Sequence, residues 1–199
     1  MKSAAMLFCL CFTSTVLMPV SIEAQNLVPN GSFDTDVSGW TLTIPDVTMV
    51  WDANDRHGAP YVGSAVITND YSLTGMRKVV NSSCVTGIVG GQLYDVGAWI
   101  EAPTGQGTSG TVSIFAFFYS DSSCTLSLGI GTGVTDIAPT DTWTLYNVTN
   151  IAAPANAGSA RFEIWNSRAS AVPWEFHVDD TFVGPPGTVP VELLTLEVY

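Results

Sequence analysis

The sequence has few basic residues. Its 199 residues include 6 Lys and Arg against 18 Asp and Glu, which gives a formal net charge of −12. Nucleic acids and anionic membranes are bound through clustered positive charge, so this balance excludes both as expected partners. The acidity is compatible with a bound cation or with a neutral ligand.

Long hydrophobic runs are confined to the start of the chain. In Met1–Ala24 a single Lys precedes an apolar stretch that ends on the small residue Ala24. This pattern predicts a signal peptide that is cleaved after Ala24. A membrane anchor is the weaker alternative, because Ser14, Thr15 and Pro19 interrupt a run shorter than the roughly 20 apolar residues of a spanning helix. We therefore expect an exported protein, secreted or periplasmic, without a membrane span after cleavage.

Cysteine is scarce too. Of the four cysteines, Cys9 and Cys11 lie within the expected signal peptide, which leaves Cys84 and Cys124 in the mature chain. An even pair in an exported protein is more often a structural disulfide than a metal or catalytic site. We predict this disulfide, with a contribution of about 2–4 kcal/mol from closing a loop of about 40 residues. No thiol would then remain for nucleophilic chemistry.

Helical periodicity is missing throughout. Val, Thr, Ile and aromatic residues instead form short runs between clusters of Gly, Pro, Asn and Asp, which indicates β-strands. The predicted strands are Thr41–Ile44, Val47–Trp51, Gly63–Thr68, Met76–Val80, Leu93–Glu101, Thr111–Ser120, Trp143–Val148, Ala160–Asn166 and Glu175–Val183. Nine strands without internal repeats predict an all-β fold, a two-sheet antiparallel jelly-roll β-sandwich, in a monomer. This domain would span residues 25–184, followed over 185–199 by a Pro/Gly linker and an apolar C-terminal strand.

Alternating side chains in three strands indicate which residues face the core. In the runs "YDVGAWIEA", "TVSIFAFFYS" and "ARFEIWN" small and aliphatic residues share one face, and aromatic residues also occupy the other. Aromatic rings beside carboxylates are typical of a face on which sugars stack. The candidate ligand-binding residues on this outer face are Trp99, Glu101, Phe115, Phe117, Glu163 and Trp165. The alternative is a second small core covered by loops. Trp51, Tyr71 and Trp174 are rival ligand-binding candidates, whereas Trp40 is interpreted as structural.

Catalytic constellations are not recognisable. The chain has only two histidines, His57 and His177, without the spacing of a zinc hydrolase, and it lacks a Gly-x-Ser-x-Gly motif. Glu101 and Glu163 form the only carboxylate pair to consider for glycoside hydrolysis, if they lie about 5–9 Å apart. We therefore expect a protein that is not an enzyme.

Several segments, in order, resemble the galactose-binding-like jelly rolls of family 4, 9 and 22 carbohydrate-binding modules. They are "NLVPNGSFDTDVSGW", "VGSAVIT", "YDVGAWI", "DTWTLYNVTN" and "FHVDDTF", and they span Asn26 to about Gly184. The chain is also similar to small exported bacterial proteins of this fold, which pair a cysteine before "YDVGAWI" with one in "FFYSDSSC". The resemblance implies a binding module for a neutral or uronic polysaccharide.

In such modules the opening turn and the last strand share a structural calcium ion. The resemblance carries that role onto the side chain of Asp34, the carbonyl of Ser32, a group from Asp55 or Ser64, and Asp179. Calcium prefers six to eight hard oxygen ligands, which these residues would supply in part. Those modules place Glu where Asp34 stands, and the shorter side chain weakens this expectation. The alternative is an Asx-type turn at Asn30 with solvated aspartates.

Two functions from different classes follow. The first is a secreted, non-catalytic module that binds a polysaccharide or glycan through the aromatic face. The alternative is an exported interaction protein that binds another exported protein, through the same face or through the C-terminal strand "VELLTLEVY".

Overall fold

The protein is an all-β sandwich. The computed structural model describes residues 25–43, 46–58, 63–70, 77–129, 131–170 and 172–188. The predicted signal peptide, Tyr71 and the C-terminal segment 189–199 lie outside the described residues. The strands are β1 (Thr41–Leu42), β2 (Val47–Asp52), β3 (Ser64–Asn69), β4 (Arg77–Asn81), β5 (Leu93–Glu101), β6 (Gly110–Tyr119), β7 (Thr132–Ile137), β8 (Thr144–Ala152), β9 (Ser159–Arg168) and β10 (Trp174–Gly184). Within the described ranges, no helix is long and apolar enough to cross a membrane.

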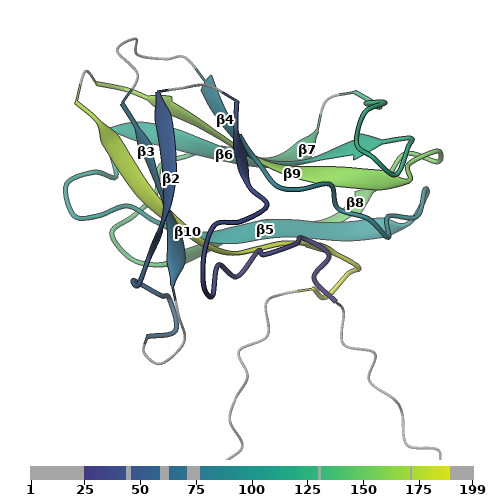
Figure 1. Ribbon diagram of the computed structural model, residues 1–199, viewed down its shortest axis with the longest axis horizontal. Helices are drawn as coiled ribbons and strands as arrows, with labels where there is room; N and C mark the ends of the chain where they lie inside the picture. The colour runs from purple at the N-terminus through teal and green to yellow at the C-terminus, as the bar shows by residue number, and fades with distance from the viewer. Residues whose placement is uncertain are drawn as a thin grey trace, which may run out of the picture.

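The strands form two antiparallel sheets that pack face to face (Figure 1). Sheet A has the order β1-β4-β9-β6-β7, and sheet B has the order β2-β3-β10-β5-β8. Apart from β2–β3 and β6–β7, neighbouring strands are not consecutive in sequence, as expected of a jelly roll, and the pairings of these strands are antiparallel. The predicted fold class is therefore confirmed.

The core lies between the sheets and is built from the alternation read in the sequence. Val112, Ile114 and Ala116 of β6 are buried against Ala98 and Ile100 of β5 in one hydrophobic cluster. Their neighbours along each strand point outward, because successive side chains alternate between the two faces. This alternation leaves the odd-numbered residues of β6 and β9 on the outer face of sheet A.

Strand β10 is buried over nearly its whole length. The first described segment of the chain is hydrogen-bonded to it. The Leu27 amide donates to Val183 O at 2.8 Å, and the Thr181 amide donates to Gly31 O at 2.8 Å. A Cβ on Gly31 would lie 2.3 Å from Thr181 O, so only glycine permits this approach. Trp40 follows and packs its ring 5.2 Å from that of Phe33 at the core, which supports its structural interpretation.

The sequence prediction missed one strand. Strand β7 closes one edge of sheet A, yet its sequence "TGVTDI" contains Gly133 and follows Gly131, and glycine is depleted from strands. Gly133 is required there, because a Cβ would lie 1.8 Å from Ile114 O of β6. The described ends of the other nine strands differ from the predicted ones by a few residues at most.

The predicted disulfide is confirmed. Cys84 and Cys124 are bonded, with their Cα atoms 5.7 Å apart. The bond joins the segment that follows β4 to the loop that follows β6, so it links two parts of sheet A that are not adjacent in the sheet order.

Replacing both cysteines by serine is expected to lower the free energy of unfolding by about 2–4 kcal/mol, because the unfolded chain gains the entropy of an open loop of about 40 residues. Urea denaturation of the double variant and the oxidised wild type measures the difference. Equal stability of the two proteins would contradict the assigned role of the bond.

Candidate functional site

Three aromatic rings cluster on the outer face of sheet A. Phe115 and Phe117 project from β6, and Trp165 projects from the adjacent strand β9. The Phe117 and Trp165 rings are stacked, with centroids 5.7 Å apart and planes inclined by 16°. Phe115 lies edge-on to both, at 5.8 Å from Phe117 and 5.2 Å from Trp165. Three of the predicted ligand-binding residues thus form one platform.

The platform can contact a ligand only from outside. A flat ligand between two rings needs a separation of about 7–8 Å, twice the distance of carbon atoms in contact. Phe117 and Trp165 lie too close for this, because they already stack on each other. Phe115 is only 7% exposed, whereas Phe117 and Trp165 are partly exposed. The contact surface therefore consists of the free parts of these two rings.

Glu163 lies beside the rings and is oriented by one of them. Its register partner on β6 is Phe115, and its Oε2 accepts a hydrogen bond from Trp165 Nε1 at 2.7 Å. Burial raises the pKa of the Glu163 carboxyl, and the bond from Trp165 and the charge of Arg161 partly offset that increase. A buried carboxylate with remaining acceptor capacity can bind the hydroxyl groups of a ligand.

The structure adds residues that the sequence analysis did not select. Asn81 of β4 is the register partner of Glu163, and its Oδ1 is buried without a hydrogen-bond partner. Arg161 of β9 lies two residues before Glu163, and its Nε is also buried without a partner. Polar atoms of this kind are normally satisfied. The periodicity of β9 already placed Arg161 on this face, but no motif distinguished it.

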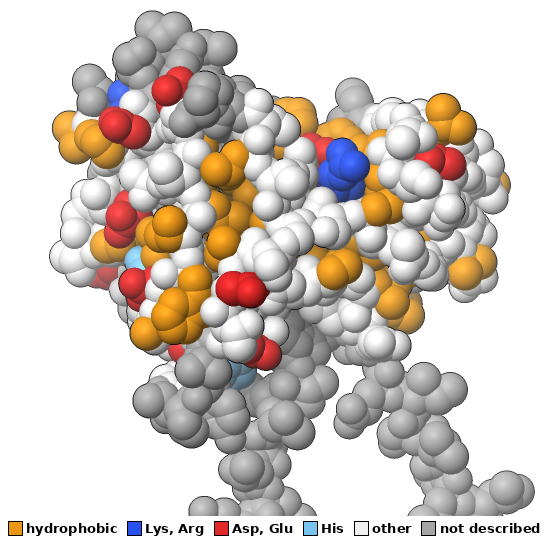
Figure 2. Space-filling view, in the orientation of Figure 1, with side chains coloured by type: hydrophobic (Ala, Val, Ile, Leu, Met, Phe, Trp, Pro, Cys, Tyr) orange, Lys and Arg blue, Asp and Glu red, His pale blue; other side chains and the backbone are white. Residues whose placement is uncertain are grey.

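In Figure 2, hydrophobic side chains lie beside acidic and basic ones along the upper edge of the molecule, near sheet A. Gly131, which precedes β7, borders the platform. A Cβ there would lie 2.7 Å from Phe117 Cδ2, so a larger residue would displace that ring.

The other two predicted ligand-binding residues do not belong to this face. Trp99 and Glu101 are on β5, so they lie on the outer face of sheet B. A loop covers them, since the Arg56 guanidinium lies 4.3 Å over the Trp99 ring and Asn54 Nδ2 donates to Glu101 Oε1 at 2.6 Å. A single six-residue sugar face, as predicted, is therefore not what the structure shows.

The same separation affects the carboxylate pair considered for catalysis. Glu101 and Glu163 lie on the outer faces of opposite sheets, with the sandwich core between them. Glycosidase carboxylates flank one bond from within a single cleft. These two residues cannot act in that way.

The rival tryptophans are placed differently from one another. Trp174 is completely buried, stacks on Phe176 at 4.8 Å and donates from Nε1 to Gln106 O, so it belongs to the core. Trp51 is 38% exposed on β2 and donates from Nε1 to Phe33 O. Of these two tryptophans, only Trp51 is exposed enough to contact a ligand.

The predicted calcium ligands are only partly gathered. Asp179 is buried, whereas Asp34 is exposed. The Ser64 hydroxyl lies 3.4 Å from Nδ1 of His177, and Ser32 has a partly exposed side chain. Asp55 is near enough for its charge to act on Asp179. In the part of the chain that the structure describes, no three His, Cys, Asp or Glu residues are grouped in a way that could hold a metal ion.

Asp179 is nevertheless the most perturbed acid of this region. Burial, followed by the charge of Asp180, raises the pKa of Asp179 to about 8, and Asp55 adds to the increase. The backbone amide of Asp180 donates to Asp179 Oδ1 at 2.7 Å and acts in the opposite direction. A cation near Asp179 and Asp55 would offset the repulsion between these carboxylates.

Asp180 binds the loop that covers Trp99 and Glu101. Its backbone φ of 44° marks the irregularity in β10 between Asp179 and Phe182. Its Oδ2 accepts from Arg56 Nε at 2.5 Å and lies 3.0 Å from His57 Nε2. The loop that carries Arg56 and His57 is thereby fixed against sheet B.

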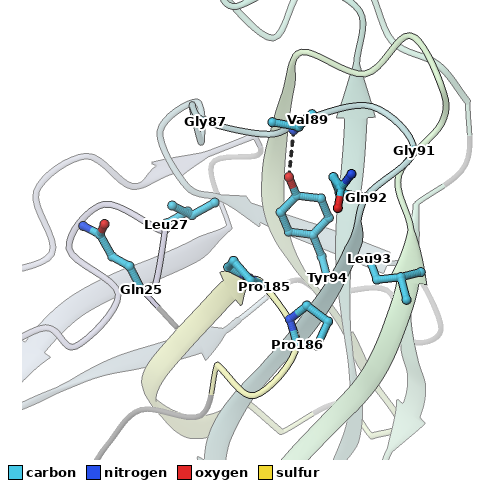
Figure 3. Close-up of a pocket in the computed structure, with 10 residues that line it drawn as sticks. All are labelled: Gln25, Leu27, Gly87, Val89, Gly91, Gln92, Leu93, Tyr94, Pro185 and Pro186. Carbon is cyan, nitrogen blue, oxygen red and sulfur yellow. Dashed lines mark hydrogen bonds between the residues drawn. The ribbon is translucent and has the colours of Figure 1, made fainter. Parts of the chain in front are cut away.

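A hollow of about 610 Å³ lies where the first and last described segments meet (Figure 3). Leu27, Leu93, Pro185 and Pro186 give it a largely apolar lining, and the Tyr94 hydroxyl accepts a hydrogen bond from the Val89 amide. Among the described residues that line it, there is neither a carboxylate nor a histidine. None of the predicted site residues lies in this hollow.

Comparison with solved structures shows the fold. One similar structure is the enzymatically active domain of bacteriophage CBA120 tailspike protein 4, with a TM-score of 0.61, 19% identity and coverage of 80% of this chain and 21% of that one. A family 61 carbohydrate-binding module in complex with β-1,4-galactotriose has a TM-score of 0.53, 15% identity and coverage of 80% and 97%. The C-terminal family 22 module of Clostridium thermocellum xylanase 10B has a TM-score of 0.52, 16% identity and coverage of 82% and 98%.

The chain therefore has a jelly-roll β-sandwich fold similar to that of these carbohydrate-binding modules, as its sequence segments predict. It spans about a fifth of the tailspike chain and nearly all of the two modules. No protein-family model matches the chain, and no curated protein matches its sequence.

Replacing Arg56 by Gln is expected to lower the free energy of unfolding by about 3 kcal/mol, because Asp180 would keep a largely buried charge with a weakened partner. The double variant Arg56→Gln/Asp180→Asn should lose less, since both charges are gone. Denaturant unfolding of the wild type, the two single variants and the double variant measures this coupling. If the double variant lost as much free energy of unfolding as the two single variants together, the pairing of Arg56 with Asp180 would be contradicted.

Proposed function

We propose that this chain is a non-catalytic module that binds a polysaccharide or glycan on the outer face of sheet A. The observation that carries the proposal is the partly exposed Phe117–Trp165 pair, which adjoins the Glu163 carboxylate. Aromatic rings can cover the apolar face of a sugar, and the adjacent Glu163 carboxylate can accept hydrogen bonds from its hydroxyl groups. The fold shared with carbohydrate-binding modules supports this function.

Each residue would have a distinct part in binding. Trp165 would provide a ring face and, through Nε1, hold the Glu163 carboxylate in place. Glu163 would then accept hydrogen bonds from sugar hydroxyls. Most of this geometry exists before the ligand arrives, so little side-chain ordering would be needed on binding.

Export is part of the same proposal. It rests on the signal peptide predicted over Met1–Ala24 and is supported by the disulfide, since such bonds persist mainly in oxidising compartments.

Replacing Trp165 by Ala is expected to reduce retention on a bound polysaccharide at least tenfold, because the variant loses both the ring and the donor to Glu163. The fold should persist, since the Trp165 side chain is partly exposed. Retention on a panel of insoluble polysaccharides, with melting temperatures as a check of folding, measures the effect.

Trp51→Ala is the matched control. This residue is another partly exposed tryptophan, but it lies on sheet B. If Trp165→Ala were retained on the polysaccharide like the wild type while Trp51→Ala lost retention, the binding site would lie on sheet B.

A structural calcium ion remains a second proposal, and Asp179 supports it. A buried carboxylate beside two other acids would be stabilised by a divalent cation, which carries charge opposite to all three. Asp179 and Asp55 are the described side chains that would hold the ion. Its effect would be on stability, because Asp179 lies on β10 of sheet B, away from the platform.

Calcium should raise the melting temperature of the wild type and leave that of Asp179→Asn unchanged. In a chelator near pH 7 the variant should be at least as stable as the wild type, because folding of the wild type must protonate Asp179, whose folded pKa of about 8 lies above that of the unfolded carboxyl. Differential scanning calorimetry in calcium and in chelator tests both statements. An equal response of the two proteins to calcium would exclude Asp179 as a ligand.

A further inference from the structure

Arg161 is held in a fixed position on the candidate face. It lies on β9 opposite Phe117, and its guanidinium carbon is 5.5 Å from the centroid of the Tyr119 ring. Its Nε is buried without a hydrogen-bond partner. A long side chain that is ordered over an aromatic ring loses less entropy when it binds a ligand. Arg161 is therefore a preorganised donor beside the platform.

The positive charge of Arg161 is not neutralised by an ion pair, unlike that of the other arginines whose side chains the structure describes. Arg56 pairs with Asp180, and Arg168 lies 3.8 Å from Asp70. Arg161 forms no ion pair within the described ranges, although the chain has a net charge of −12. Glu163, two residues along the same face, accepts its hydrogen bond from Trp165 instead. Arg161 thus remains available to an anionic group.

We infer that the face binds glycans that carry uronic acid residues, and that Arg161 binds their carboxylate. This inference rests on the function proposed above and specifies its ligand. The planar guanidinium matches a carboxylate through two parallel N–H donors. Phe117 and Trp165 would contact the sugar ring, while Arg161 would select the charged substituent.

The net charge of the chain limits the density of charge on the ligand. A strongly acidic protein repels a polyanion, and this repulsion acts over a distance of about 8–10 Å at moderate salt. One arginine next to the Glu163 carboxyl cannot offset it for a glycan that carries a charge on every residue. The expected ligand is therefore a largely neutral glycan with scattered uronate groups.

The test compares each acidic glycan with its own carboxyl-reduced form, which differs only in the charged group. The probes are glucuronoxylan, polygalacturonate and alginate, and the proteins are the wild type, Arg161→Gln, Arg161→Lys and Trp165→Ala. Affinity electrophoresis or calorimetry at two salt concentrations measures binding. Melting temperatures show whether each variant is folded.

The wild type should bind glucuronoxylan about tenfold more tightly than its reduced form, and added salt should diminish this preference. Arg161→Gln should bind both forms equally, at the level of the wild type on the reduced form. Arg161→Lys should keep part of the preference, because it retains the charge without the paired donors.

The alternative outcomes separate the two proposals. Equal binding of acidic and reduced forms by the wild type would overturn the role of Arg161 and leave the glycan-binding function intact. A preference that survives in a folded Arg161→Gln variant would overturn it as well. Tightest binding to the fully charged polygalacturonate or alginate would contradict the limit on charge density. Absence of binding to every acidic and reduced form would overturn both proposals.

Discussion

The uninterrupted pairing of β6 with β9 is the constraint on which the candidate site depends. Its register runs from Gly110 opposite Arg168 to Tyr119 opposite Ser159 without a bulge. A slip by one residue would turn Phe115, Phe117 and their partners toward the core and expose aliphatic side chains instead. Because Ile114 and Phe162 are buried in the core, the aromatic and charged side chains next to them in each strand must lie on the outer face of sheet A.

The two outer faces of the sandwich differ in how far a loop of the protein covers them. On sheet B the loop through Arg56 covers Trp99 and pairs with Asp180, so that face is largely closed by the protein itself. On sheet A, Phe117 and Trp165 stay partly exposed and stack on each other. The face of sheet A is therefore the one whose aromatic platform we propose as the ligand contact.

Much of the fold could be predicted from the sequence, and the candidate site only in part. Alternation in β5, β6 and β9 identified which side chains leave the core, because the period of two is a local property of a strand. It could not tell that Trp99 leaves on one sheet and Trp165 on the other, since the assignment of strands to sheets depends on distant pairings. Strand β7 was missed because its glycines are selected by close contact with β6. The polar atoms of Asn81 and Arg161 became visible only when burial and hydrogen bonds could be assessed together.

Indole N–H resonances offer the most direct test of the central claim that ligands contact the face of sheet A. The chain has six tryptophans, and the Trp165 indole is the one bonded to Glu163. During titration with a glycan fragment, the account predicts that the Trp165 resonance shifts with ligand concentration while those of Trp51 and Trp174 remain in place. A saturable shift of Trp51 with Trp165 unchanged would contradict it.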